Sequence, residues 1–130
     1  MAYCEKRTIT LTLSGGATSG TAYSPVVNGR IVSIRYIPAA SGTKLEGASG
    51  NFDLTIKSET TQGNIWVETG ITAAKTVYPS RLAQDTAGAD TTIRDVIQVA
   101  DERISFAVAN ADADSSGSWE LTIEGTFKGV

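Results

Sequence analysis

The chain of 130 residues contains no histidine and one cysteine, Cys4. Without an imidazole, the Ser-His-Asp and Cys-His catalytic arrangements are excluded, and so are zinc sites built from cysteine and histidine. A single cysteine cannot form an intrachain disulfide, and it is compatible with a reducing compartment. These two counts therefore remove the commonest nucleophilic and zinc-dependent chemistries.

The sequence also lacks long apolar runs and a large net charge. No segment approaches the roughly 20 apolar residues of a transmembrane helix. Lys6-Arg7 leads directly into an alternating pattern instead of the apolar run of a secretory signal. We therefore expect a protein that is made in a cytoplasm, has no signal peptide and does not bind a membrane. Eleven basic against fourteen acidic residues give a net charge of −3, which argues against nucleic-acid binding through phosphate neutralisation.

The chain is instead rich in period-two alternation of apolar and polar residues, which is typical of half-buried strands. In residues 7–13, for example, Ile9, Leu11 and Leu13 alternate with threonines. Stretches of small turn-forming residues at 39–50 and 83–92 are expected to be loops, the first of them mobile. Strands are predicted at 7–13, 31–37, 51–57, 65–69, 76–78, 93–99, 103–108 and 119–127.

These predictions indicate an all-β fold, a two-sheet antiparallel sandwich of about eight strands. A jelly-roll-like arrangement is favoured over an immunoglobulin-like one, although the order of strand pairing does not follow from the sequence. We expect a single β-sandwich domain at 7–130, preceded by an N-terminal arm at 1–6 that lacks apolar alternation. Free termini of this kind often become ordered only on a partner.

The acidic segment 110–117 comes nearest to a metal site, because it places oxygen ligands at alternate positions before a glycine. A calcium loop of the EF-hand type requires glycine at its sixth position and glutamate at its twelfth. Those positions hold Ser115 and Leu121. A solvated turn is therefore the favoured interpretation, and we expect no metal and no other cofactor.

Paired carboxylates could perform glycosidase chemistry if two of them shared a cleft. The alternation places the candidates on the outer faces of predicted strands, where carboxylates are usually solvated. An acid-only hydrolase is thus a minor alternative, and we expect no catalytic residue and no enzyme. The candidates are Asp53, Glu68, Glu120 and Glu124.

The two tryptophans raise the possibility of carbohydrate binding, because sugar rings stack on exposed aromatic faces. Trp119 shares the parity of Leu121 and Ile123 and is expected in the core. Trp66 alternates against Ile65 and Val67, so it would be exposed if both of those residues are buried. An exposed tryptophan on a sheet is more often covered by another element or subunit.

Residues 78–82, Tyr-Pro-Ser-Arg-Leu, combine an aromatic residue, an arginine and a rigid turn. Tyrosine and arginine are enriched in protein interfaces. We therefore take Tyr78, Arg81 and Leu82, together with Tyr3 in the arm and the loop at 39–50, as the candidate interface.

Segments 7–13, 22–36, 65–69, 78–81 and 101–104, followed by the final strand, resemble the capsid decoration (cement) proteins of tailed bacteriophages. The resemblance implies a jelly-roll-type virion protein that binds the outer surface of an assembled capsid. It also implies a homo-oligomer, a dimer or trimer, that bridges subunits of the major capsid protein. The family has no shared catalytic motif, so no site residue carries over. A phage tail or fibre component, or a carbohydrate-binding β-sandwich module, is the alternative.

Overall fold

Every regular element in residues 2–47 and 50–126, the part of the chain that the computed structural model describes, is a β-strand. Within that part no helix is long and apolar enough to cross a membrane. The strands are, in chain order, β1 (Ala2–Thr12), β2 (Gly20–Tyr23), β3 (Val27–Pro38), β4 (Phe52–Ser58), β5 (Asn64–Ile71), β6 (Lys75–Val77), β7 (Ser80–Gln84), β8 (Asp90–Val96), β9 (Gln98–Glu102), β10 (Ile104–Ala109) and β11 (Ser116–Thr126).

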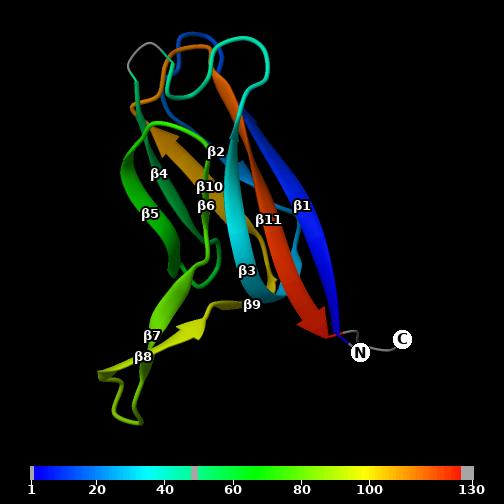
Figure 1. The fold of residues 1–130 in the computed structure, drawn as a ribbon, viewed down its shortest axis with the longest axis vertical. Helices are drawn as coiled ribbons and strands as arrows, with labels where there is room; N and C mark the ends of the chain where they lie inside the picture. The colour runs from blue at the N-terminus through cyan, green and yellow to red at the C-terminus, as the bar shows by residue number, and fades with distance from the viewer. Residues whose placement is uncertain (1, 48–49, 127–130) are drawn as a thin grey trace.

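The strands form two main antiparallel sheets, and their pairing is nested (Figure 1). One sheet has the order β1-β11-β3-β6, with β9 also paired to β3, and the other has the order β2-β10-β4-β5. The first strand thus pairs with the last, the second with the second-last, and β4 with β5 at the centre of the nest. This is the pairing of a jelly roll, so the predicted fold class is confirmed.

The core lies between the two sheets and is centred on four aromatic rings. Tyr36 of β3 meets Phe52 of β4 with 5.0 Å between ring centroids, and Trp119 of β11 meets Phe106 of β10 at 5.6 Å. Each of these contacts joins one sheet to the other, and all four rings are buried. The predicted core position of Trp119 is therefore confirmed, whereas the predicted final residue of its strand, Phe127, lies outside the described residues.

Alternation predicts the buried side correctly along the regular strands. The residues predicted to point inward do face the opposite sheet, because the side chains of successive residues in a strand point to opposite faces. The residues that bear out the prediction are Ile9, Leu11, Leu13, Phe52, Leu54, Ile56, Ile104, Phe106, Val108, Leu121 and Ile123.

The loop at 39–50 is not the mobile segment that its composition suggested. Leu45 and Glu46 are buried, and the Tyr36 hydroxyl donates a hydrogen bond to Oε1 of Glu46 at 2.5 Å. The backbone is held as well, since the Asp112 N–H donates to the Leu45 carbonyl at 3.1 Å. The prediction is wrong for this part of the loop because Leu45 fills the end of the core against Tyr36. Residues 48 and 49 lie outside the described residues.

The segment expected as an N-terminal arm is drawn into a strand. Residues 2–6 form the first half of β1, where Ala2 lies opposite Thr126 and Lys6 opposite Thr122. These residues have little apolar character, but β11 continues alongside them and supplies a hydrogen-bonding ladder. Strand pairing with a long neighbour, rather than burial, therefore orders this end of the chain.

Candidate interaction surface

A two-stranded ribbon interrupts the edge of the larger sheet (Figure 1). β6 pairs with β3 at Ile34–Tyr36, and β9 pairs with the same strand at Val27–Arg30. Between these pairings the chain leaves the sheet after Val77 and returns at Ile97, whose carbonyl accepts a hydrogen bond from the Ile31 N–H at 2.9 Å. Residues 78–96 are therefore an excursion from the sandwich, and we call them the ribbon.

The ribbon consists of β7 and β8, which pair only with each other. Ser80 lies opposite Val96, and the turn at 85–89 is closed by Asp85, whose Oδ1 accepts hydrogen bonds from the N–H groups of Ala87 and Ala89 at 2.9 and 3.0 Å. Residues 83–84 and 90–92 of the predicted loop are therefore strand, and 85–89 form the turn. A β-bulge near Thr91 breaks the alternation that would have indicated the strand.

No residue of the ribbon is buried, although it carries several large apolar side chains. Tyr78 is 74% exposed and Ile93 68%, and Leu82 and Val96 are also exposed. A two-stranded ribbon is marginally stable on its own and ordinarily needs further strands or a covering layer. Exposed apolar side chains gathered on one element mark an interaction surface.

Three of the four predicted interface residues, Tyr78, Arg81 and Leu82, lie on the ribbon. The fourth, Tyr3, lies in β1 opposite Gly125, and its side chain is outside what the structure describes. Since β1 and β6 occupy opposite edges of the larger sheet, Tyr3 is not brought together with the other three. The sequence analysis did not single out Ile93 and Val96, which it placed in an ordinary strand at 93–99. No local sequence pattern indicates that this part of the chain projects from the sandwich.

Two hollows flank the ribbon. The first, of about 500 Å³, lies at its base on the outer face of the larger sheet and is lined by Val32, Tyr78 and Val96 beside the ion-paired Arg30 and Glu124. Apolar side chains thus form the floor of a groove with charged walls.

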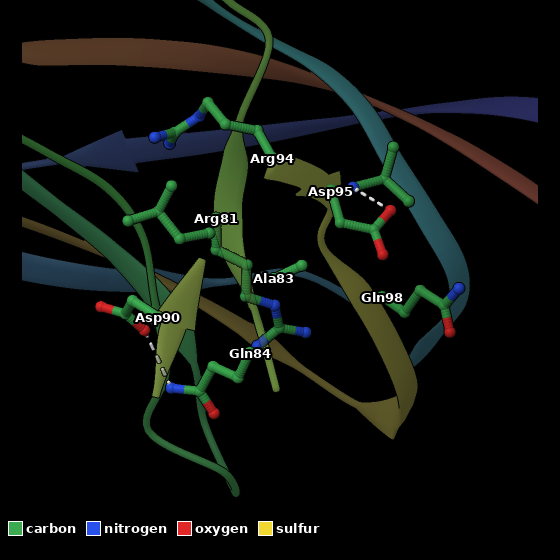
Figure 2. A pocket seen from close by; sticks show the side chains of 9 residues that line it. Arg81, Ala83, Gln84, Asp90, Arg94, Asp95 and Gln98 are labelled. Carbon is green, nitrogen blue, oxygen red and sulfur yellow. Dashed lines mark hydrogen bonds between the residues drawn. The ribbon is translucent and has the colours of Figure 1, made fainter. Parts of the chain in front are cut away.

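The second hollow lies along the ribbon itself (Figure 2). Its walls are polar, with Gln84 Nε2 donating to Asp90 Oδ1 at 3.1 Å, and Arg81 reaches toward its middle (Figure 2). Within the described residues Arg81 makes no hydrogen bond or ion pair, so its guanidinium is available to a partner.

The four candidate carboxylates each engage a different group. Asp53 accepts hydrogen bonds from the Gly70 N–H and the Asn110 side chain at 3.0 and 2.7 Å. Glu68 accepts from Lys75 at 2.8 Å and from the Trp66 indole at 3.0 Å. The hydrogen bond from Lys75 is the main reason that the pKa of Glu68 is lowered.

The remaining two carboxylates, Glu120 and Glu124, form ion pairs with Lys6 and Arg30 on the outer face of the larger sheet. Three of the four carboxylates are thus paired with a basic side chain at the surface and Asp53 accepts neutral donors, and nothing in this pattern matches two acids that share a cleft.

The carbohydrate hypothesis required an exposed Trp66, which the alternation predicted only if Ile65 and Val67 were both buried. Trp66 is only 7% exposed, Ile65 is also buried, and Val67 is exposed in its place. The register between β4 and β5 shifts at this point, so a bulge turns two successive side chains inward. The aromatic platform for a sugar ring is therefore absent at this position.

The acidic segment at 110–117 is organised by hydrogen bonds within the protein. Asp114 Oδ1 accepts from the Gly16 N–H at 3.2 Å, and the Ser115 hydroxyl donates to the Asp112 carbonyl at 2.6 Å. Across residues 2–47 and 50–126, no group of three histidine, cysteine or acidic side chains is placed to hold a metal ion.

No known family and no curated relative indicates a function for this chain, so the function is argued from its structure. Neither the models of known protein families nor the curated proteins contain a match to this sequence.

Proposed function

We propose that this chain is a non-enzymatic virion protein that binds the outer surface of an assembled phage capsid and reinforces contacts between subunits of the major capsid protein. The proposal joins the jelly-roll fold to the resemblance of the sequence to capsid decoration proteins. The ribbon and the groove at its base are the docking surface, with Tyr78, Leu82 and Val96 as its apolar contacts and Arg81 as a polar one.

The single observation that carries the proposal is that the ribbon is ordered without being buried. Fixing the backbone of each residue costs about 1–2 kcal/mol of conformational entropy, and residues 78–96 bury no side chain in return. β6 and β9 both pair with β3 without it. An insertion that adds nothing to the core of its own chain is best explained by contacts with another molecule.

Such docking would stabilise a shell without any chemical step. A protein that binds assembled subunits and not free ones shifts the equilibrium toward assembly. Many copies on one shell act together, so modest affinity at each site is sufficient. The polar, threonine-rich outer face of β1 leaves the rest of the surface compatible with solvent.

The test is co-sedimentation with purified phage heads that lack the protein. We expect the wild type to sediment with expanded heads, and a double variant, Tyr78→Ser with Leu82→Ser, to lose at least tenfold in apparent affinity. Tyr23→Ser is the matched control, because Tyr23 is an exposed tyrosine outside the ribbon. Absence of wild-type binding, or equal binding by the double variant and the control, would contradict the proposal.

A more drastic variant removes the docking surface while keeping the sandwich. Val77 lies opposite Ile34, and Ile97 bonds to Ile31, so the two ends of the ribbon are about 10 Å apart along β3. A Thr-Gly-Thr link in place of residues 78–96 spans this gap. We expect the linked protein to remain folded by circular dichroism and to show no binding to heads.

A further inference from the structure

Asn28 is the one asparagine of the chain that is followed by glycine, and the fold requires that glycine. Asn28 lies in β3, where the register with β9 shifts between Val27 and Gly29. Gly29 has a φ of +129°, which residues with side chains rarely adopt, and a Cβ there would overlap the carbonyl oxygen of Glu124 in β11. Glycine adopts this conformation at no steric cost. The fold therefore keeps an Asn-Gly pair at this position of β3.

Asp101 of β9 holds the side-chain amide of Asn28 at both of its ends. The Asn28 Nδ2 donates to Asp101 Oδ1 at 2.7 Å, and the Asn28 Oδ1 accepts a hydrogen bond from the Asp101 N–H, also at 2.7 Å. An amide can donate and accept in this way, whereas a carboxylate only accepts. Asp101 has a φ of 50°, a left-handed conformation that is uncommon outside glycine. We call this pair of hydrogen bonds the clamp, because it fixes both residues across the register shift.

An Asn-Gly pair is chemically labile, because the glycine has no side chain to hinder ring closure by its own backbone nitrogen. The Gly29 nitrogen gives its proton to solvent and attacks Cγ of Asn28, and the Cγ–Nδ2 bond breaks. Nδ2 takes a proton back from solvent and leaves as ammonia, so that a succinimide ring remains. Water then opens the ring at either of its carbonyl carbons, and residue 28 becomes aspartate or isoaspartate. The reaction consumes one water and releases one ammonia.

The clamp blocks the first step of this reaction. Ring closure brings Cγ of Asn28 onto the nitrogen of Gly29, and the side chain cannot rotate there while both ends of its amide are bonded to Asp101. The clamp is released when β9 separates from β3. β9 is five residues long, its buried apolar side chain is Val99 alone, and among the described strands it pairs only with β3. Elements with so few buried contacts open locally at lower free energy than the core does.

We propose that Asn28 is a deamidation site that the clamp keeps intact while β9 is paired with β3, and that opening of this pairing exposes the residue to modification. Deamidation removes the donor of the clamp and places a second carboxylate against Asp101, and like charges that face each other destabilise a strand pair. Isoaspartate also adds a methylene to the backbone, which disturbs the register. The change is one-way, so a modified chain keeps β9 loosened where it follows the ribbon. This inference is independent of capsid binding.

The test follows Asn28 by mass spectrometry while the protein is incubated at mildly alkaline pH. Trypsin releases residues 8–30 as one fragment, in which Asn28 is the sole asparagine. We expect the folded wild type to deamidate at least tenfold more slowly than the chain unfolded in guanidinium chloride. Asp101→Gly removes an acceptor of the clamp and suits the positive φ, so it should raise the folded rate at least threefold. Asp101→Asn keeps an acceptor oxygen and should keep the wild-type rate.

The matched control is Asp53→Ala, which removes the acceptor of the Asn110 side chain, a similar hydrogen bond elsewhere in the protein. It should leave the rate at Asn28 unchanged. Circular dichroism establishes that each variant is folded before its rate is compared. If Asp101→Gly does not fold, the comparison of folded with unfolded wild type still decides whether the fold protects the site.

A second measurement tests the consequence of the modification. Asn28→Asp carries the charge of the product, and we expect the amides of β9 to exchange with solvent deuterium at least tenfold faster in this variant than in the wild type. Adding Asp101→Asn restores a donor opposite an acceptor and should recover slow exchange. Equal deamidation rates in folded and unfolded wild type, an Asp101→Gly rate no greater than that of Asp53→Ala, or unchanged exchange of β9 in Asn28→Asp would each overturn the inference. None of these outcomes depends on binding to phage heads.

Discussion

The sandwich and the ribbon are built from the same kind of amphipathic strand and differ completely in what their apolar side chains contact. Phe106 of β10 is fully buried against Trp119 of the facing sheet, whereas Ile93 of β8 is 68% exposed. Alternation indicates that one face of a strand is apolar, but burial requires a second layer opposite that face. The sandwich supplies its own second layer, whereas the ribbon has none within its own chain.

The largest expected effect separates the energetic roles of the two regions. Phe106→Ala should lower the free energy of unfolding by about 3–5 kcal/mol, because it leaves a cavity between the sheets. Ile93→Ala should change it by no more than about 0.5 kcal/mol, as is usual for an exposed site. Chemical denaturation of both variants at one protein concentration makes the comparison. Equal losses would mean that the ribbon is part of the cooperative core.

A smaller effect is expected at the end of the core where Tyr36 meets Glu46. Burial, followed by the hydrogen bond and the charge of Glu46, raises the pKa of the Tyr36 hydroxyl above its ordinary value. Tyr36→Phe should cost about 1–3 kcal/mol at neutral pH, because the buried carboxyl group of Glu46 loses a donor.

The same residue predicts a dependence on alkaline pH. Since the folded pKa is raised, the stabilisation is complete below the unfolded pKa of about 10 and is lost as the pH rises further, by up to about 1.4 kcal/mol per pH unit. Denaturation midpoints from pH 8 upward should fall less steeply in Tyr36→Phe than in the wild type. The exposed Tyr78→Phe is the control and should keep the wild-type slope; a slope shared by all three proteins would refute the assignment.

The smallest expected effect concerns the ion pair of Glu68 with Lys75. The pKa of Glu68 is lowered chiefly by the hydrogen bond from Lys75. Its contribution is therefore present above the unfolded pKa of about 4.3 and lost as the pH falls through the folded value. Because the pair lies at the surface and is only partly buried, Glu68→Gln should cost no more than about 1 kcal/mol at neutral pH. The difference from wild type should shrink in acid and in high salt, and a salt-independent difference would contradict an ionic origin.

The sequence was a good guide wherever a strand was regular and faced the other sheet. The buried apolar residues of β4, β10 and β11 follow from period two alone, although Ser105 of β10 is buried as well. It was a poor guide at bulges, as at Trp66, where alternation left the buried side open and a shift of one residue turns the indole inward next to Ile65. A bulge depends on how two strands fit together, and neither strand encodes that fit by itself.

The candidate interface stays a prediction, and the structure adds only where its residues lie. Tyr78, Arg81 and Leu82 were recognisable by residue type, because aromatic residues and arginine next to a proline turn are common in interfaces. Their arrangement on a projecting ribbon, with Ile93 as a further exposed apolar side chain, was not recognisable. The strand containing Ile93 has an ordinary alternating pattern, and only its position outside the sheets distinguishes it.

By itself, the sequence determined that this protein is all-β, that its strands are amphipathic, and that histidine- and thiol-pair chemistry is excluded. These properties follow from composition and from the two-residue period of a strand, which are local. The tertiary structure alone decided that Leu45 closes the core, that Trp66 is buried, and that residues 78–96 stand outside the sandwich. Those outcomes depend on which surfaces oppose one another, and that is a property of the whole fold rather than of any segment.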